Sequence, residues 1–416
     1  MVAYHFPPLA GSSGIQRTLR FAQQLPEFGW QPIVLTTQPR AYERTSDDLL
    51  REVPTDLPVA RVFALDTARH LSVAGRYPHF LARPDRWMTW RFAAVGAGLA
   101  LVRQHGLHAV WSTFPIATAH QIGGTLARRT RLPWIADFRD PMAQDGYPED
   151  PVTWRSFKAI EEKTIAAARW SVFTTPGAAR AYRRHYPAAA DRIVVVENGF
   201  DEESFSGFDA DVAREPLRPG AITLLHSGMV YPWERDPTQF FMAIAKIVDA
   251  GDVRDGELVV RFRAAGYDDR LRALATEFGI ERFIELLPPI PYRAALEEML
   301  RADALLVLQA ANCNEQIPAK LYEYLRSGRP IVALTDPVGD TAGVARAAGV
   351  TAIAPLDSTV DIATLLVRVI AALRAGTAAL PSADYVAAAS RRGRARELAA
   401  LLDRASAPAA PADRPA

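Results

Sequence analysis

Short apolar runs of strand length alternate with amphipathic stretches along most of this chain. They cover residues 32–36, 109–113, 134–138, 170–175 and 193–196 in the first half, and residues 222–226, 258–263, 283–287, 304–308, 331–334 and 349–353 in the second. Between these runs, apolar residues recur with a helical period, as at Leu321, Tyr324 and Leu325. The alternation predicts an α/β protein in which each half is a doubly wound domain built on a parallel sheet, with a cleft between the two.

The pattern weakens toward the middle and the end of the chain, and these places set the predicted domain boundaries. Residues 201–218 are polar and contain proline, so we expect them to link an N-terminal domain (1–200) to a C-terminal domain (219–380). Residues 381–404 predict a final helix. One option is that this helix packs back on the N-terminal domain. The Ala/Pro-rich residues 405–416 predict a disordered tail.

Two stretches of the first half fit the alternation poorly. Residues 1–8 look like the end of a strand, so either the first strand is short or the true start of the protein lies upstream. Residues 38–90 show no clear period and are rich in Pro, Arg and Asp. We expect them to be irregular and to contribute to specificity, as long surface loops commonly do.

The stretch from Glu315 to Leu334 has the most informative local chemistry. Pro318 suits the first turn of a short helix, Gly328 suits a left-handed residue just after it, and a buried strand follows. A helix N-terminus binds anions, and Glu323 lies roughly 8 Å along the axis from it, with Glu315 on the other side. The segment could therefore hold a sugar, a diphosphate and a ribose in a row. The alternative is an ordinary αβ unit with two solvated glutamates.

Two glycine-containing turns are further candidates for contact with a ligand. Gly11 and Gly14 join the first strand to an amphipathic helix, and Gly228 follows the first strand of the second half. Glycine allows a ligand to approach the backbone, although both could be plain turns. Arg235 follows the second turn and suits a phosphate clamp; the alternative is a surface arginine.

A charged cluster closes the strand that begins at residue 134. Asp137, Arg139 and Asp140 come at its carboxyl end, where open α/β sheets bind ligands. A carboxylate there can accept a hydrogen bond from a sugar hydroxyl, whereas the alternative is an Arg–Asp pair that fixes a turn. His120, on a predicted helix, is either a ligand contact or a packed or surface residue.

Composition narrows the function classes. The net charge of +1 gives no overall field that would attract nucleic acid or an acidic membrane. A single cysteine, Cys313, rules out an internal disulfide and fits a reducing compartment. The longest apolar run, residues 92–102, is shorter than the ~20 residues that span a bilayer. The chain contains neither a P-loop nor a G-x-G-x-x-G fingerprint, which argues against a dehydrogenase.

Taken in order, these segments resemble glycosyltransferases of the GT-B fold, and specifically the family 4-like retaining enzymes. The resemblance extends to about residue 404. Its markers are Phe6-Pro7-Pro8 with Gly11 and Gly14, Asp137 to Pro141, Asn198-Gly199, Gly228, Arg235-Asp236-Pro237 and Glu315 to Pro330. Within the last of these, two glutamates separated by seven residues are the most specific feature.

The resemblance implies a nucleotide-diphosphate-sugar donor bound mainly by the C-terminal domain, and transfer with retention of configuration. Glu323 would bind the ribose, and Glu315 the transferred sugar. Arg235 and Lys320 would neutralise the diphosphate, helped by N–H groups near Ile317 and Ala319 and by the Gly11–Gly14 loop. His120, Asp137, Arg139 and Asp140 would line the acceptor side. No metal or other cofactor is implied; the one D-x-D string, Asp209 to Asp211, falls in the predicted linker.

Two departures from the family pattern keep other functions open. Met229 stands where relatives usually have a basic residue, and the loop at Glu315 lacks their glycine–aromatic–glycine run. The missing basic residue at Met229 leaves a degenerate carbohydrate-binding or scaffold protein as one alternative. A GT-B sugar-nucleotide epimerase, which would share the donor site, is another. The resemblance suggests cell-envelope polysaccharide synthesis in the cytoplasm, with peripheral contact at the inner face of the membrane as a further option. Donor base and sugar, acceptor (glycan, lipid-linked or small molecule), linkage and oligomeric state are not readable from the sequence.

Overall fold

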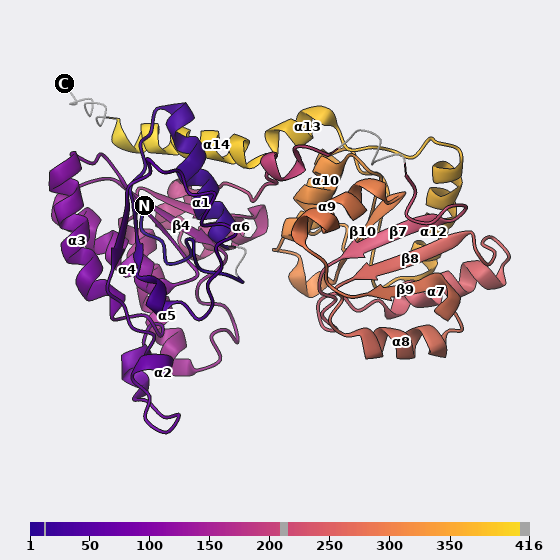
Figure 1. Cartoon of the computed structure of the whole chain (residues 1–416), viewed down its shortest axis with the longest axis horizontal. Helices are drawn as coiled ribbons and strands as arrows, with labels where there is room; N and C mark the ends of the chain where they lie inside the picture. Colours follow the sequence, from indigo (N-terminus) through magenta and orange to yellow (C-terminus); the bar gives the residue numbers. More distant parts are fainter. Residues whose placement is uncertain (12–13, 209–214, 408–416) are drawn as a thin grey trace. The chain divides into compact units, whose positions relative to one another are not determined.

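The computed structural model describes residues 1–11, 14–208 and 215–407. The chain forms two compact units. Unit 1 comprises Met1–Glu197 together with the segment from Arg391 onward, and unit 2 comprises Asn198–Ser390. Figure 1 shows both, with the chain coloured from its N-terminus to its C-terminus.

Unit 1 is built on parallel strands. Its strands are β1 (Val34–Thr37), β2 (Val59–Val62), β3 (Val110–Thr113), β4 (Trp134–Arg139), β5 (Trp170–Phe173) and β6 (Ile193–Val195). They pair in the orders β1-β2 and β3-β4-β5-β6. Val2 joins the two groups, because it forms parallel bridges to Leu35 of β1 and to Ser112 of β3. The first residues therefore lie between β1 and β3, in the middle of the combined sheet.

Helices cover both faces of this sheet. They are α1 (Gly14–Gln24), α2 (Thr67–His70), α3 (Trp90–His105), α4 (Ala117–Thr130), α5 (Pro151–Ala167), α6 (Pro176–His185) and α14 (Arg391–Ser406). On one face, α3 to α6 bury apolar side chains against β3 to β5. On the other face, Phe21 of α1 and Leu398 of α14 pack with Trp111 and Trp170. Figure 1 shows α14 running beside α1, although the two helices come from opposite ends of the chain.

Unit 2 contains one parallel sheet of six strands. They are β7 (Ile222–Ser227), β8 (Leu258–Arg263), β9 (Ile284–Leu287), β10 (Ala304–Gln309), β11 (Ile331–Thr335) and β12 (Ile353–Ala354), in the order β12-β11-β10-β7-β8-β9. Numbered within the unit, this is the 3-2-1-4-5-6 order of the Rossmann fold. The order reverses between β7 and β10, and the crevice outside their carboxyl ends is where such sheets bind ligands.

Two cores flank the unit 2 sheet. Its helices are α7 (Thr238–Asp249), α8 (Asp268–Glu277), α9 (Tyr292–Arg301), α10 (Ala319–Ser327), α11 (Asp340–Ala347), α12 (Thr359–Arg374) and α13 (Ala383–Ala388). Alternate residues of β10 face opposite sides: Leu306 packs with α7, α8 and α12, and Leu305 with α9, α10 and α11. A strand buried on both faces gives a continuous apolar run, which is why the sequence shows these strands clearly.

The structure corrects three expectations about local structure. Residues 38–90 are not wholly irregular, because they contain β2 and α2. Strand β2 is only half-buried and pairs with β1 alone, so it leaves no apolar run in the sequence. The single helix expected over 381–404 is two helices, interrupted where Ser390 forms a parallel bridge with Phe200. Pro318 precedes α10 in an extended conformation instead of opening its first turn.

Candidate functional site

Apart from Gly11 and Gly14, which belong to unit 1, the residues predicted to bind the donor lie around the switch point of the unit 2 sheet. Gly228 directly follows β7, and the loop 310–318 follows β10 and leads into α10. Gly228 has φ +107°, a conformation that glycine adopts readily. It packs so closely that a Cβ added to it would lie 3.1 Å from the Nζ of Lys320. The turn after β7 and the first turn of α10 therefore meet at Lys320.

Lys320 is held by His226, which lies near the end of β7. The Nδ1 of His226 lies 2.9 Å from the Leu306 carbonyl oxygen, so Nδ1 carries the proton and Nε2 accepts. Lys320 Nζ donates to that Nε2 at 3.0 Å. Burial and, next, the positive Arg235 lower the pKa of Lys320 to about 7, with Glu323 acting in the opposite direction. Burial followed by the Lys320 charge lowers the pKa of His226 well below its usual range.

Arg235 supplies a second cation close to Lys320. Its guanidinium donates to the Met229 carbonyl oxygen at 2.8 Å and lies over the ring of Tyr231, 5.3 Å from the ring centroid. The next residue, Asp236, accepts a hydrogen bond from the Thr238 main-chain N–H at 3.1 Å, where α7 begins. The Arg-Asp-Pro motif thus fixes the start of a helix and the position of the arginine together.

Glu323 lies half-buried on α10 and is oriented by a tyrosine from α9. The Tyr292 hydroxyl donates to Glu323 Oε1 at 2.9 Å. The adjacent Tyr324 is fully buried, and its hydroxyl accepts from the main-chain N–H of Ser227 at 2.8 Å. Residues 323 and 324 therefore connect α10 both to α9 and to the turn after β7.

Glu315, Ile317 and Ala319 lie on the loop and helix start that follow β10. Glu315 and Ala319 are exposed, whereas Ile317 is buried. Gln309, the last residue of β10, fixes this loop, because its Nε2 donates to the carbonyl oxygens of Cys313 and Gln316 at 2.6 and 3.0 Å.

Sequence reasoning missed Gln309 and His226. Both are polar residues at the carboxyl end of an apolar strand, and that position was the available signal.

In unit 1, Asp137 forms a buried ion pair. Both of its oxygens accept from the guanidinium of Arg17 at 2.9 Å, and one also accepts from the Thr113 hydroxyl at 3.0 Å. The Asp137 side chain is 0% exposed and that of Arg17 is 5% exposed. Arg17 also donates to the carbonyl oxygens of Val196 and Glu197. In this arrangement Asp137 ties α1 to the sheet.

Arg139 and Asp140 follow an irregularity in β4, because its pairing with β5 shifts register between Asp137 and Arg139. Arg139 has φ +63°. A Cβ added at Gly14 would meet the Arg139 guanidinium at 2.3 Å and the His5 ring at 2.6 Å, so these three residues are packed together. Burial lowers the pKa of Arg139. Burial and the charge of Arg139 together lower the pKa of His5 to about 4.

Asp140 and Gly11 are both exposed on unit 1. Partial desolvation by the surrounding protein raises the pKa of Asp140, and the charge of Arg139 acts in the opposite direction. Gly11 has φ +80° and open space around it.

His120 lies in the core of unit 1. It is 1% exposed, and its ring contacts those of Phe138 and Trp134. Its Nδ1 is 2.8 Å from the Ser112 hydroxyl, and its Nε2 has no hydrogen-bond partner. Burial lowers the pKa of His120 to about 3, so the ring is neutral at physiological pH.

The structure thus places Gly228, Arg235, Lys320, Glu323, Glu315, Ile317 and Ala319 around one edge of the unit 2 sheet, and Gly11, Gly14, His120, Asp137, Arg139 and Asp140 in unit 1.

Within the described residues, no group of three or more His, Cys, Asp and Glu side chains is arranged to hold a metal ion. Asp209 to Asp211, the D-x-D string, lies outside the described residues. No helix in the described part of the chain is long and apolar enough to cross a membrane.

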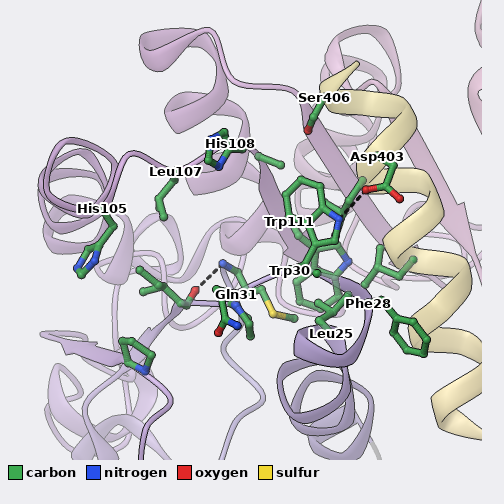
Figure 2. A pocket seen from close by; sticks show the side chains of 18 of the residues that line it. Leu25, Phe28, Trp30, Gln31, His105, Leu107, His108, Trp111, Asp403 and Ser406 are labelled. Carbon is green, nitrogen blue, oxygen red and sulfur yellow. Dashed lines mark hydrogen bonds between the residues drawn. The ribbon is translucent and has the colours of Figure 1, made fainter. Parts of the chain in front are cut away.

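A separate cavity of about 760 Å³ lies in unit 1 and contains none of the predicted site residues. Figure 2 shows the aromatic side chains of Trp30, Trp111 and Phe28 around it, with Asp403 from α14 accepting a hydrogen bond from Trp30 Nε1 at 2.9 Å. His105 and His108 line it from the other side.

Comparisons with known proteins identify relatives of both the sequence and the fold. Residues 13–199 match the family model of the glycosyl transferase 4-like domain. The D-inositol 3-phosphate glycosyltransferase of Geodermatophilus obscurus is 29% identical over 181 residues, covering 42% of this chain and 39% of the relative. That of Catenulispora acidiphila is 28% identical over 300 residues, covering 68% and 64%. Both alignments span less than two thirds of the curated relative's length.

Solved structures match nearly the whole chain at low sequence identity. A glycosyltransferase from Rickettsia africae has a TM-score of 0.65 at 12% identity and covers 97% of this chain and 98% of its own. HepE from Anabaena, in complex with UDP, has a TM-score of 0.58 at 14% identity and covers 97% of this chain and 96% of its own. A putative UDP-N-acetylglucosamine 2-epimerase from Listeria monocytogenes has a TM-score of 0.55 at 12% identity, with 97% and 95% covered. These likenesses establish the fold.

Proposed function

Because residues 13–199 belong to the glycosyl transferase 4-like family and the chain has the GT-B fold, we propose that it transfers a sugar from a nucleotide-diphosphate-sugar to an acceptor, with retention of anomeric configuration. We place this reaction in the cytoplasm, in the synthesis of cell-envelope polysaccharide. The proposed acceptor is a glycan, a lipid-linked sugar or a small molecule such as the inositol phosphate named for the relatives.

One observation carries this proposal: two cations and a helix N-terminus converge at the switch point of the unit 2 sheet. Lys320, on the first turn of α10, lies against Gly228, and Arg235 is close enough to lower the lysine pKa. The N-terminus of α10 adds unpaired N–H groups around Ile317 and Ala319. A diphosphate is the ligand that such a combination would stabilise most strongly.

These groups would act on the leaving group of the reaction. As the bond between the sugar and the diphosphate breaks, negative charge grows on the diphosphate, and Lys320 and Arg235 would stabilise it. His226 would keep the Lys320 amine aimed at this point. Glu323, oriented by Tyr292, would accept hydrogen bonds from the ribose, and Glu315 would contact the transferred sugar. This chemistry requires no metal ion.

The acceptor side is proposed for unit 1. Arg139 and Asp140 lie at the carboxyl end of β4, where the Arg139 guanidinium packs against Gly14 and His5. Asp137 and His120 would act from beneath this surface, because both are buried.

A donor screen tests the proposal. The protein would be incubated with UDP- and GDP-sugars, with and without D-inositol 3-phosphate or lipid-linked acceptors, and the release of nucleoside diphosphate measured. We expect release that increases with acceptor, persists in EDTA, and gives a product whose anomeric configuration by NMR matches the donor.

Loss of activity in EDTA would contradict the metal-free mechanism, and inversion would contradict retention. An epimerised sugar nucleotide formed without acceptor would instead favour an epimerase. Donor binding with neither release nor epimerisation would favour a carbohydrate-binding protein. Binding of UDP to the Glu323→Ala variant as tightly as to the wild type would remove Glu323 from the ribose site.

A further inference from the structure

A groove in unit 1 combines a cationic rim with a partly apolar floor. It has a volume of about 820 Å³ and runs between α4 and α5. From His120 to Arg128 it follows nine residues of α4, a rise of roughly 12 Å. Trp134 and Ile160 contribute the floor. Small residues, among them Gly124, Ala159 and Ala167, keep the two helix surfaces from filling the space.

The rim carries charge of one sign only. Six basic residues line the groove: Arg91, Arg128, Arg131, Lys163, Arg169 and Arg192. No acidic residue is among the described residues that line it, and none of the six is in an ion pair within the described part of the chain. This concentration is local, because the whole chain has a net charge of +1. Uncompensated like charges repel one another, so an anion placed between them is stabilised.

Two further features distinguish the groove from a merely basic surface. Arg192 is fixed, because its guanidinium donates to the Ala166 and Ala168 carbonyl oxygens at 3.3 and 2.6 Å at the end of α5. At the other end, His120 lines the groove while its buried Nε2 has no hydrogen-bond partner. The groove therefore offers a positioned cation at one end and a neutral polar atom at the other, with apolar surface between them.

We propose that this groove binds a phosphate-bearing amphiphile, with the phosphate among the arginines and the hydrocarbon chain on the floor between α4 and α5. Charge complementarity selects the head group, since guanidinium pairs with phosphate oxygens in a bidentate geometry. The floor selects the chain, since each buried CH₂ favours binding. A free inorganic phosphate would use only half of the site. The inference concerns binding to unit 1 and does not depend on sugar transfer.

The test uses the full chain and three probes below their micelle concentrations: dodecyl phosphate, dodecyl maltoside and inorganic phosphate. Dodecyl phosphate should bind in calorimetry and raise the melting temperature, because it binds the folded state. The neutral maltoside and the inorganic phosphate should each bind at least about tenfold more weakly, because each lacks one of the two parts. Equal binding of dodecyl phosphate and dodecyl maltoside would overturn the proposal, and so would equal binding of dodecyl phosphate and inorganic phosphate.

Paired variants localise the binding. Arg128 and Arg129 are neighbours in the last turn of α4 and are both exposed, but only Arg128 lines the groove. Arg128→Glu should weaken dodecyl phosphate binding about tenfold, whereas Arg129→Glu, with the same change in net charge and helix dipole, should not. Likewise Ala167→Leu should obstruct the groove, whereas Ala166→Leu should leave binding unchanged. Equal effects within either pair would place the amphiphile elsewhere.

Discussion

At the scale of single residues, Lys320 is the group whose charge we expect a bound diphosphate to change. Its pKa of about 7 reflects burial and the nearby Arg235, with Glu323 opposing. In the unfolded chain a lysine keeps its proton up to a pH near 10. Between these two values the unfolded state binds more protons, so through this group the stability of the folded state increases with pH. A bound diphosphate would reverse this preference, because it stabilises the charged amine.

We therefore predict that UDP binding is accompanied by proton uptake. In the free protein Lys320 is about half protonated near pH 7 and mostly neutral near pH 8, so uptake should approach about one proton per UDP at pH 8 and fall toward zero below pH 6. Calorimetric titration in buffers of different ionisation enthalpy measures this number. His226 should not contribute, because its pKa is far below this window.

Lys320→Arg is the matched control for this prediction. Arginine keeps the positive charge but does not titrate, so the variant should bind UDP without taking up a proton at pH 8. Uptake that persists in the variant would assign the proton to another group.

Asp137 and Asp140 are close in sequence but should respond differently to truncation. Asp137→Ala removes the partner of the buried Arg17, and an uncompensated buried charge typically costs about 3–5 kcal/mol of unfolding free energy. Asp140 is exposed, so Asp140→Ala should change stability by less than about 0.5 kcal/mol while lowering transfer activity. Urea unfolding and donor-release assays separate the two effects. Comparable stability of both variants would mean that the Arg17–Asp137 pair does not hold α1 to the sheet.

At the scale of secondary-structure elements, the turn after β7 works because it has no side chain at Gly228. Gly228→Ala introduces a strained φ, with a cost of roughly 1–2 kcal/mol, and places a methyl group against the Lys320 amine. Gly251→Ala introduces a similar strain at φ +76° but meets nothing within 4 Å. We predict that both variants lose comparable stability in thermal unfolding, while only Gly228→Ala loses UDP affinity. Unchanged affinity in Gly228→Ala would separate this turn from the donor site.

Most elements of unit 2 could be predicted from the sequence because their strands are buried on both faces. The runs at 222–226 and 304–308 agree with β7 and β10 to within a residue. Gly328 adopts the left-handed conformation expected of it, at φ +68°. The half-buried β2 gave no comparable signal, because an edge strand needs no continuous apolar run.

The candidate site was predictable only in part, because many of its contacts join segments that are far apart in the sequence. Spacing from a helix start pointed to Glu323, position after the Gly228 turn pointed to Arg235, and the family resemblance implied Lys320. Hydrogen bonds between distant segments, however, do not show in a sequence. His226 and Lys320 are 94 residues apart, and Arg17 and Asp137 are 120 apart. Asp137 was expected to line the acceptor side, with a structural Arg–Asp pair as the alternative. The local pattern did not show that its partner would be Arg17 of α1.

At the scale of the whole molecule, the chain returns to its first unit at its end. Helix α14 buries Ala395, Leu398 and Leu402 in the same cluster as Phe21 of α1 and Trp111 of β3. Unit 1 is therefore made of two segments separated by all of unit 2. Because the closing helix comes last in the sequence, the apolar face formed by Phe21 and Trp111 is covered only when residues beyond 390 are present.

We predict that Leu398→Ala destabilises unit 1 by about 2–4 kcal/mol, since Leu398 is 1% exposed and truncation leaves a cavity. Tryptophan fluorescence can follow this change, because seven of the eight tryptophans lie in unit 1 and only Trp233 lies in unit 2. Leu380→Ala, at a leucine of unit 2 that is 59% exposed, is the control and should shift the transition by less than about 0.5 kcal/mol. Because two units need not unfold together, the fluorescence transition of Leu398→Ala should shift to lower denaturant. Its UDP binding at low denaturant should stay at the wild-type level. Loss of UDP binding in step with the fluorescence change would show instead that α14 stabilises both units as one cooperative structure.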